Sequence, residues 1–185
     1  MSEGPSRVAV VTGGASGIGR CVVQELAHRG WRVASLDLAP SEADLAFEVD
    51  MRDAEAVSEA VSQVEARLGP VDAAVSVAGH YEMLPFSDIT LEAWERMLQV
   101  HLGGLRNLLT ATLPGMLGRR SGSIVATASE LAVGGGGPGD AHYAAAKGAV
   151  LGLVRSLAPE VADQGVRVNA VAPGPTDTPL LAADS

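Results

Sequence analysis

Short apolar runs alternate along the chain with longer segments in which apolar residues recur at helical spacing. The short runs are typical of buried parallel strands and predict strands over residues 7–12, 32–37, 46–49, 72–77, 122–128 and 166–172. The longer segments predict helices over residues 18–29, 53–68, 90–118 and 142–163. This alternation predicts an α/β fold, a doubly wound parallel sheet with helices on both faces in three α/β/α layers.

Local signals refine these helices. Asp53 and Thr90 each precede a helix and are suited to act as N-caps, because their side-chain oxygens can accept hydrogen bonds from the first free N–H groups. Pro114 and Gly115 are expected to bend or interrupt the helix that contains them. The run Gly134–Gly139, of sequence GGGGPG, predicts a flexible loop. This loop is either a mobile border of a binding pocket or a tolerated surface insertion.

Length and composition indicate one domain, residues 1–185, with a substantial core. The chain has 185 residues, of which 47% are hydrophobic, as expected for a parallel sheet covered on both faces. Its net charge is −9 and it has no basic cluster, which argues against nucleic acid and anionic membranes as partners. The N-terminus has no apolar signal-peptide segment, and no apolar stretch is long enough to span a bilayer, so we expect a cytoplasmic protein.

The cysteine and histidine content predicts neither a disulfide nor a metal site. The single cysteine, Cys21, cannot form an intrachain disulfide, and we expect it to be a small buried filler at the start of a helix. The four histidines, His28, His80, His101 and His142, show no metal-ligand spacing with cysteines or carboxylates.

A glycine-rich turn follows the first predicted strand and opens the first predicted helix. Its sequence, from Thr12 to Gly19, is Thr-Gly-Gly-Ala-Ser-Gly-Ile-Gly. A strand, a glycine turn and a helix together place free N–H groups and the positive end of a helix dipole against a pyrophosphate. The spacing Gly-x-x-x-Gly-x-Gly differs from the commoner Gly-x-Gly-x-x-Gly. An ordinary tight turn is the alternative, but the flanking strand and helix favour a Rossmann-like dinucleotide site.

An acidic residue at the end of the second strand indicates which dinucleotide binds. Asp37 lies about 20 residues past the glycines, where a carboxylate can hydrogen-bond the adenosine ribose hydroxyls. A carboxylate there also repels a 2′-phosphate, and neither Leu38 nor Ala39 supplies a compensating cation. The pattern favours NAD over NADP. The alternative is a solvated aspartate at a strand end.

Three residues in the second half of the chain predict acid–base chemistry. Tyr143 and Lys147 are four residues apart, so on a helix their side chains share one face. A cation beside a phenol favours the phenolate, so we expect Lys147 to lower the pKa of Tyr143. Such a tyrosine can exchange a proton with an alcohol or ketone oxygen. Ser129 ends an apolar run and is expected at the carboxyl end of a strand, where ligands of open α/β sheets bind. Alone, Tyr-x-x-x-Lys is a weak signal.

These motifs occur in an order that resembles the short-chain dehydrogenase/reductase family, classical type, over essentially the whole chain. Thr12 to Gly19 is similar to the family's Thr-Gly-x-x-x-Gly-Ile-Gly cofactor turn. The other segments that match in order are Asp50-Met51, Ser76–Gly79, Gly122–Ser129, the Tyr143–Lys147 helix and Arg167–Gly174.

The resemblance implies roles for individual residues. Tyr143 would be the general acid/base, Lys147 would lower its pKa and bind the nicotinamide ribose, and Ser129 would hydrogen-bond the substrate oxygen. Asp50 and Met51 would touch adenine, and Thr176 and Thr178 the nicotinamide amide. The implied cofactor-binding set is Gly13, Ser16, Gly17, Ile18, Gly19, Asp37, Asp50, Met51, Ala78, Gly79, Tyr143, Lys147, Pro173, Gly174, Thr176 and Thr178.

The chain departs from the family pattern in three places. His101 stands where the family has a catalytic Asn that holds a proton-relay water. This histidine either replaces the Asn, weakens the relay, adds pH dependence near neutrality, or merely packs between helices. Ser76 replaces an Asn near the cofactor, a milder change. The family also continues past the position of Ser185 with a substrate-covering segment and one more strand, so the sequence is either shortened or a natural fragment.

Together these observations predict an NAD-dependent oxidoreductase that interconverts a small-molecule secondary alcohol and a ketone. The alternative is a catalytically weak or inactive NAD-binding scaffold of the same fold. The helices predicted over 90–118 and 142–163 carry apolar residues on more than one face. With the family resemblance, this implies a homodimer or homotetramer.

Overall fold

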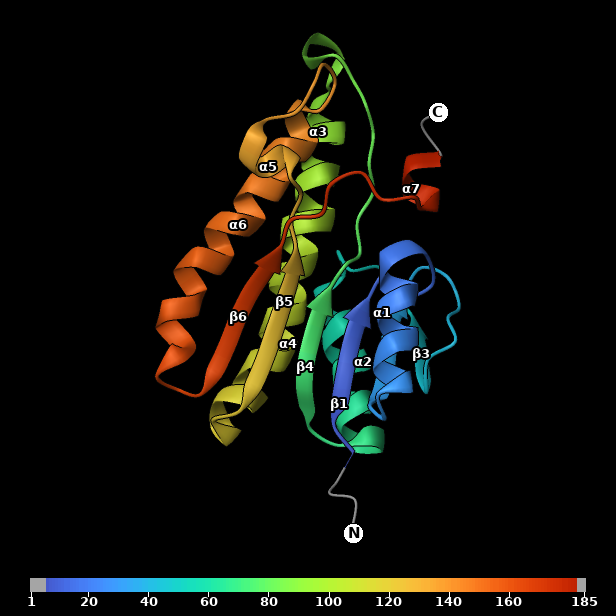
Figure 1. Ribbon diagram of the computed structural model, residues 1–185, viewed down its shortest axis with the longest axis vertical. Coiled ribbons are helices and arrows are strands. Elements are labelled where there is room, and N and C mark those ends of the chain that lie inside the picture. Colours follow the sequence, from blue (N-terminus) through green and yellow to red (C-terminus); the bar gives the residue numbers. More distant parts are fainter. Residues whose placement is uncertain (1–5, 183–185) are drawn as a thin grey trace.

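A parallel six-stranded sheet forms the middle of the molecule (Figure 1). The structure is a computed structural model and describes residues 6–182. The strands lie in the order β3-β2-β1-β4-β5-β6, and every neighbouring pair is parallel. Their bounds are β1 Val8–Thr12, β2 Arg32–Asp37, β3 Leu45–Glu48, β4 Val71–Ser76, β5 Gly122–Thr127 and β6 Val166–Val171.

Helices cover both faces of the sheet, which confirms the three-layer α/β fold predicted from the sequence. In Figure 1, α1 lies in front of the sheet and α2 and α4 lie behind it. Side chains of α2, α4 and α6 share one large apolar core with the strands, whereas α1 packs on a smaller cluster around Val11, Val23 and Val33. The helix bounds are α1 Gly17–His28, α2 Ala54–Leu68, η1 Phe86–Asp88, α3 Leu91–Leu98, η2 Gln99–Gly103, α4 Gly104–Arg119, α5 Leu131–Gly134, α6 Ala141–Ala162 and α7 Pro179–Ala182.

Strand and helix ends agree with the sequence patterns to within one or two residues, apart from one long helix. Asp53 and Thr90 act as N-caps as expected, since their side chains accept hydrogen bonds from the N–H groups of Glu55, Ala56 and Ala93. Of the two outcomes expected at Pro114, a bend or an interruption, the interruption does not occur. Helix α4 runs through Pro114, and the irregular turn is the π-helical η2, which brings His101 into the site described below.

Two further sequence expectations concern side-chain exposure. The prediction that Cys21 is buried was wrong: its position on α1 faces outward and the thiol is exposed. Within residues 6–182, no helix is both long enough and apolar enough to cross a membrane.

A buried hydroxyl joins the two central strands where the chain order reverses. β1 is flanked by β2 on one side and β4 on the other, which makes the carboxyl ends of β1 and β4 the switch point of the sheet. The Thr12 hydroxyl is fully buried there and accepts hydrogen bonds from the N–H groups of Val77 and Ala78, each at 3.1 Å. Gly13 has φ +71° and lies so close that a Cβ would be 2.8 Å from the Ala78 Cα.

We expect Thr12→Val to lower the free energy of unfolding by about 1–3 kcal/mol, because it leaves the N–H groups of Val77 and Ala78 buried without their acceptor. Urea denaturation measures the change. Thr12→Ser is the matched control, because it keeps the acceptor oxygen and should retain most of the stability. Equal losses in both variants would show that packing of the Thr12 methyl, and not the hydrogen bonds, carries the effect.

Candidate active site

A cavity of about 630 Å³ lies at the carboxyl ends of the strands. Every cofactor-binding and catalytic residue predicted from the sequence lines this one cavity. The glycine turn after β1 forms one wall, and the segments after β4, β5 and β6 form the others. The structure therefore brings together residues from Gly13 to Thr178 that are distant in sequence.

The glycine turn presents the start of α1 to the cavity. Gly19 packs so tightly on the turn that a Cβ there would lie 2.0 Å from the Gly13 carbonyl oxygen. Ser16 precedes the helix in an extended conformation, and among the described residues no side chain caps α1 and no acidic residue occupies its first turn. The first N–H groups and the positive end of the helix dipole are therefore suited to bind an anionic phosphate group.

Two carboxylates, Asp37 and Asp50, line the cavity. Asp37 accepts hydrogen bonds from the N–H groups of Ala15 at 2.9 Å and Ala39 at 3.0 Å, which fixes its carboxylate beside the glycine turn. Asp50 is paired with Arg52 at 2.5 Å, and this hydrogen bond lowers the pKa of the Asp50 carboxyl. Arg52 also lines the cavity and was missed in the sequence.

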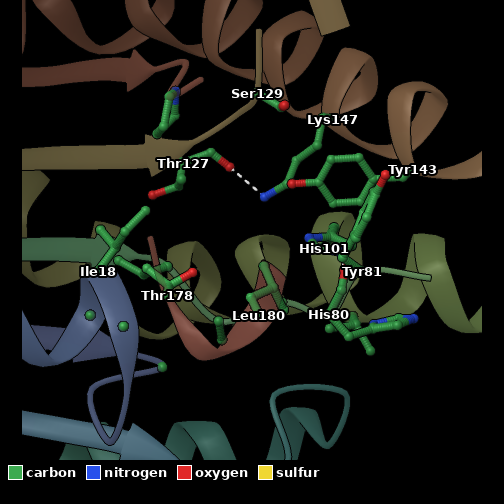
Figure 2. Close-up of a pocket in the computed structure, with 18 of the residues that line it drawn as sticks. Ile18, His80, Tyr81, His101, Thr127, Ser129, Tyr143, Lys147, Thr178 and Leu180 are labelled. Atoms are coloured by element: carbon green, nitrogen blue, oxygen red, sulfur yellow. Dashed lines mark hydrogen bonds between the residues drawn. The ribbon is translucent and has the colours of Figure 1, made fainter. Parts of the chain in front are cut away.

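Ser129, Tyr143 and Lys147 meet at one corner of the cavity (Figure 2). Lys147 is one helical turn past Tyr143 on α6 and is only 4% exposed. Its ammonium donates a hydrogen bond to the Thr127 carbonyl oxygen at 2.8 Å, and the nitrogen lies 5.7 Å from the centre of the Tyr143 ring. Burial lowers the pKa of Lys147 to about 8.

The pKa of Tyr143 is shifted in the direction opposite to that expected from the sequence. Burial raises it and is the largest cause; a hydrogen bond with Ser129 lowers it, and the negative charge of Asp140 raises it further. The expectation that Lys147 dominates was wrong, because the Lys147 ammonium is directed to the Thr127 carbonyl. The hydroxyl of Tyr143 is therefore protonated at neutral pH.

His101 is a neutral side chain packed against Tyr143. It is 4% exposed, and its ring lies edge-on to the Tyr143 ring with centroids 5.4 Å apart. Nε2 donates to the His80 carbonyl oxygen at 2.8 Å, so Nδ1 carries no proton. Burial, and then the Lys147 charge, lowers the pKa of His101 to about 3. Of the alternatives left open by the sequence, pH dependence near neutrality is therefore wrong.

Sequence reasoning missed several polar residues of the cavity. Tyr81, Arg96, Thr127 and Asp140 all line it. Asp140 alone offered a signal, because it immediately precedes α6 and lies one turn before Tyr143. No group of histidine, cysteine and carboxylate side chains in residues 6–182 is arranged to hold a metal ion.

Comparisons with known proteins agree with this geometry. The family model for short chain dehydrogenases matches residues 7–185. The chain is 38% identical to an acetoacetyl-CoA reductase of Synechocystis sp. over 96% of its own length and 75% of that protein. It is 38% identical to a cis-4-hydroxycyclohexanecarboxylate dehydrogenase of Sinomonas cyclohexanicum over 95% of its length and 76% of that protein.

A solved structure supports the same assignment. A short-chain dehydrogenase from Streptomyces avermitilis superposes with a TM-score of 0.87 at 31% sequence identity, covering 95% of this chain and 68% of that one. The fold, the order of the motifs and the extent of the match lead to one conclusion. The chain belongs to the short-chain dehydrogenase family of oxidoreductases.

Proposed function

We propose that this chain is an NAD-dependent oxidoreductase that interconverts a secondary alcohol and a ketone. The observation that carries the proposal is the convergence of Ser129, Tyr143 and Lys147 in a cavity that also contains the glycine turn and Asp37. The names of the two relatives, a reductase of a ketoacyl thioester and a dehydrogenase of a cyclic alcohol, support the same substrate class. The match covers about three quarters of each relative.

The residues present fit a nicotinamide dinucleotide. The uncapped start of α1 would hold the pyrophosphate, Asp37 the adenosine ribose, and Lys147 the nicotinamide ribose. When bound, this cofactor supplies the hydride chemistry. The protein supplies the position of the substrate and the proton.

Tyr143 would give a proton to the ketone oxygen in reduction and accept it from the alcohol in oxidation. Its raised pKa keeps the hydroxyl protonated, which is the form that donates. Ser129 is buried beside it and would hydrogen-bond the same substrate oxygen. His101, neutral and packed on the Tyr143 ring, would hold the ring in place and would not titrate during turnover.

Two further parts of the proposal concern assembly and location. The apolar faces of α4 and α6 and the family membership favour a homodimer or homotetramer. A cytoplasmic location remains a prediction from the sequence.

We expect Tyr143→Phe to lower kcat/KM about 10²–10⁴-fold, because it removes the proton donor. The measurement is the absorbance of NADH over a panel of secondary alcohols and ketones. NAD binding by calorimetry is the control and should change little. Absence of turnover in the wild type, with NAD binding intact, would favour the scaffold alternative.

Replacing Asp37 tests the choice of cofactor. Asp37→Ala should lower the preference for NAD over NADP at least about tenfold, or 1.4 kcal/mol, because it removes the charge that repels a 2′-phosphate. Calorimetric titration of both cofactors measures this ratio. Asp37→Asn is the matched variant and should behave similarly if charge is the cause. A preference that survives both changes would contradict the assignment.

Burial of the Lys147 ammonium destabilises the folded protein by an amount that depends on pH. Its pKa is about 8 in the folded protein and 10.5 in an ordinary environment, so below pH 8 folding must bury a charge, and this cost disappears as pH rises from 8 to 10.5. We expect Lys147→Met to raise the free energy of unfolding at pH 7 by roughly 2 kcal/mol. The gain should shrink above pH 8. Urea denaturation at pH 7 and at pH 10 measures it, and a variant less stable than the wild type at pH 7 would contradict the prediction.

A further inference from the structure

A buried carboxylate joins three segments at the outer end of the cavity. Asp140 is 6% exposed and immediately precedes α6. Its Oδ1 accepts a hydrogen bond from the Tyr81 hydroxyl at 2.5 Å, and its Oδ2 accepts one from the Gly137 N–H at 2.7 Å. The Leu84 N–H also donates to the Gly139 carbonyl oxygen at 3.1 Å. The loop after β4 and the glycine-rich segment are therefore tied together beside α6.

This link accounts for two glycines of the Gly134–Gly139 segment. A Cβ at Gly136 would lie 2.3 Å from the Asp140 Cβ, so a larger residue would displace the carboxylate. Gly139 has φ +97°, which favours glycine over every other residue. The segment is thus shaped to fold closely over Asp140.

Asp140 also determines what lies against Tyr143. Its partner Tyr81 places its ring edge-on to the Tyr143 ring, with centroids 5.0 Å apart and an interplanar angle of 82°. Tyr81, Asp140 and Tyr143 all line the cavity. The Tyr81 ring is therefore a wall of the space next to the proposed proton donor.

The charges around Tyr143 come from few groups. Ser129 after β5 and His101 on η2 are neutral, and Lys147 on α6 directs its ammonium to the Thr127 carbonyl. Glu82 pairs with Arg96, which lines the cavity, at 2.7 Å, and the His142 Nε2 lies 4.0 Å from the same Glu82 carboxylate. Glu130, next to Ser129, also lines the cavity. Asp140 is the acidic group whose charge opposes formation of a phenolate on Tyr143.

We propose that Asp140 is a positioning residue of the active site, which holds Tyr81 against Tyr143 as the wall of the substrate compartment and places a buried negative charge one helical turn before Tyr143. The positioning role rests on the proposed function. The effect of the Asp140 charge on the ionisation of Tyr143 does not rest on the proposed function, because it can be measured on the protein without turnover.

The chain contains only two tyrosines, which permits a direct test. In Tyr81→Phe, Tyr143 is the sole tyrosine, and its ionisation can be followed by near-ultraviolet phenolate absorbance. We expect Tyr81→Phe/Asp140→Asn to ionise at a pH lower by at least about 0.5 than Tyr81→Phe, because a buried negative charge has been removed. An unchanged or higher ionisation pH would overturn the proposal.

A matched variant controls for the loss of any charge from α6. Asp163 is an exposed carboxylate at the opposite end of that helix, so Tyr81→Phe/Asp163→Asn should ionise at the same pH as Tyr81→Phe. A shift equal to that of the Asp140 variant would overturn the proposal. Far-ultraviolet circular dichroism checks that each variant folds. If the asparagine variant does not fold, Tyr81→Phe/Asp140→Ser replaces it. Serine at position 140 is also uncharged, so this variant must show the same downward shift in ionisation pH.

Kinetics test the positioning role. Asp140→Asn should move the rising limb of the pH profile for alcohol oxidation to lower pH, because Tyr143 must be deprotonated to act as a base. Tyr81→Phe should raise KM several-fold without moving the limb downward. Proportional loss of activity in both variants, with the limb unmoved, would assign Asp140 a merely structural role and overturn the proposal. If the wild-type protein shows no turnover, the proposed function is refuted. The spectroscopic test of the Asp140 charge would still be valid, because it does not need turnover.

Discussion

The buried Thr12 hydroxyl is the contact on which the site depends. It joins β1 to the end of β4 at the point where the sheet changes direction, and the glycine turn rests directly on this junction. A Cβ at Gly13 would overlap the Ala78 backbone and a Cβ at Gly19 would overlap the Gly13 carbonyl, so the turn can pack this closely only because both residues are glycine. The position of the α1 N-terminus, and with it the expected phosphate site, therefore follows from one hydroxyl and two missing side chains.

The corner of the cavity around Tyr143 and Lys147 buries polar and charged groups that would otherwise be hydrated. Three side chains there are nearly inaccessible to solvent: Lys147, His101 and Asp140. The loss of hydration is offset in a different way for each of them. Lys147 directs its ammonium to a carbonyl, His101 stays neutral by donating to another, and Asp140 uses both oxygens as acceptors. Such an arrangement is expected where position and protonation matter more than stability.

Much of the fold and of the cavity lining could be predicted from the sequence, for a simple physical reason. Apolar runs mark buried strands, and the carboxyl ends of parallel strands meet at one edge, so Gly13, Asp37, Ser129 and Gly174 had to lie near one another. The direction of the shift in the Tyr143 pKa could not be predicted, because it depends chiefly on how deeply Tyr143 is buried, and the spacing of Tyr143 and Lys147 along α6 does not show where the Lys147 ammonium points. The Tyr81–Asp140 contact was equally hidden, since its partners are 59 residues apart and neither belongs to a periodic pattern.

The same two residues connect the proton chemistry to the shape of the pocket. A tyrosine with a raised pKa stays protonated at neutral pH, so the form that can donate to an oxygen is abundant and the phenolate that could accept a proton is scarce. Burial and the charge of Asp140 both shift Tyr143 toward this protonated form. The hydrogen bond with Ser129 has the opposite effect and lowers the pKa of Tyr143. Since Asp140 also holds Tyr81 in the cavity wall, a substitution that removed this charge would also change the contact that holds the wall in place. Shape and proton affinity are therefore not independent variables in this site.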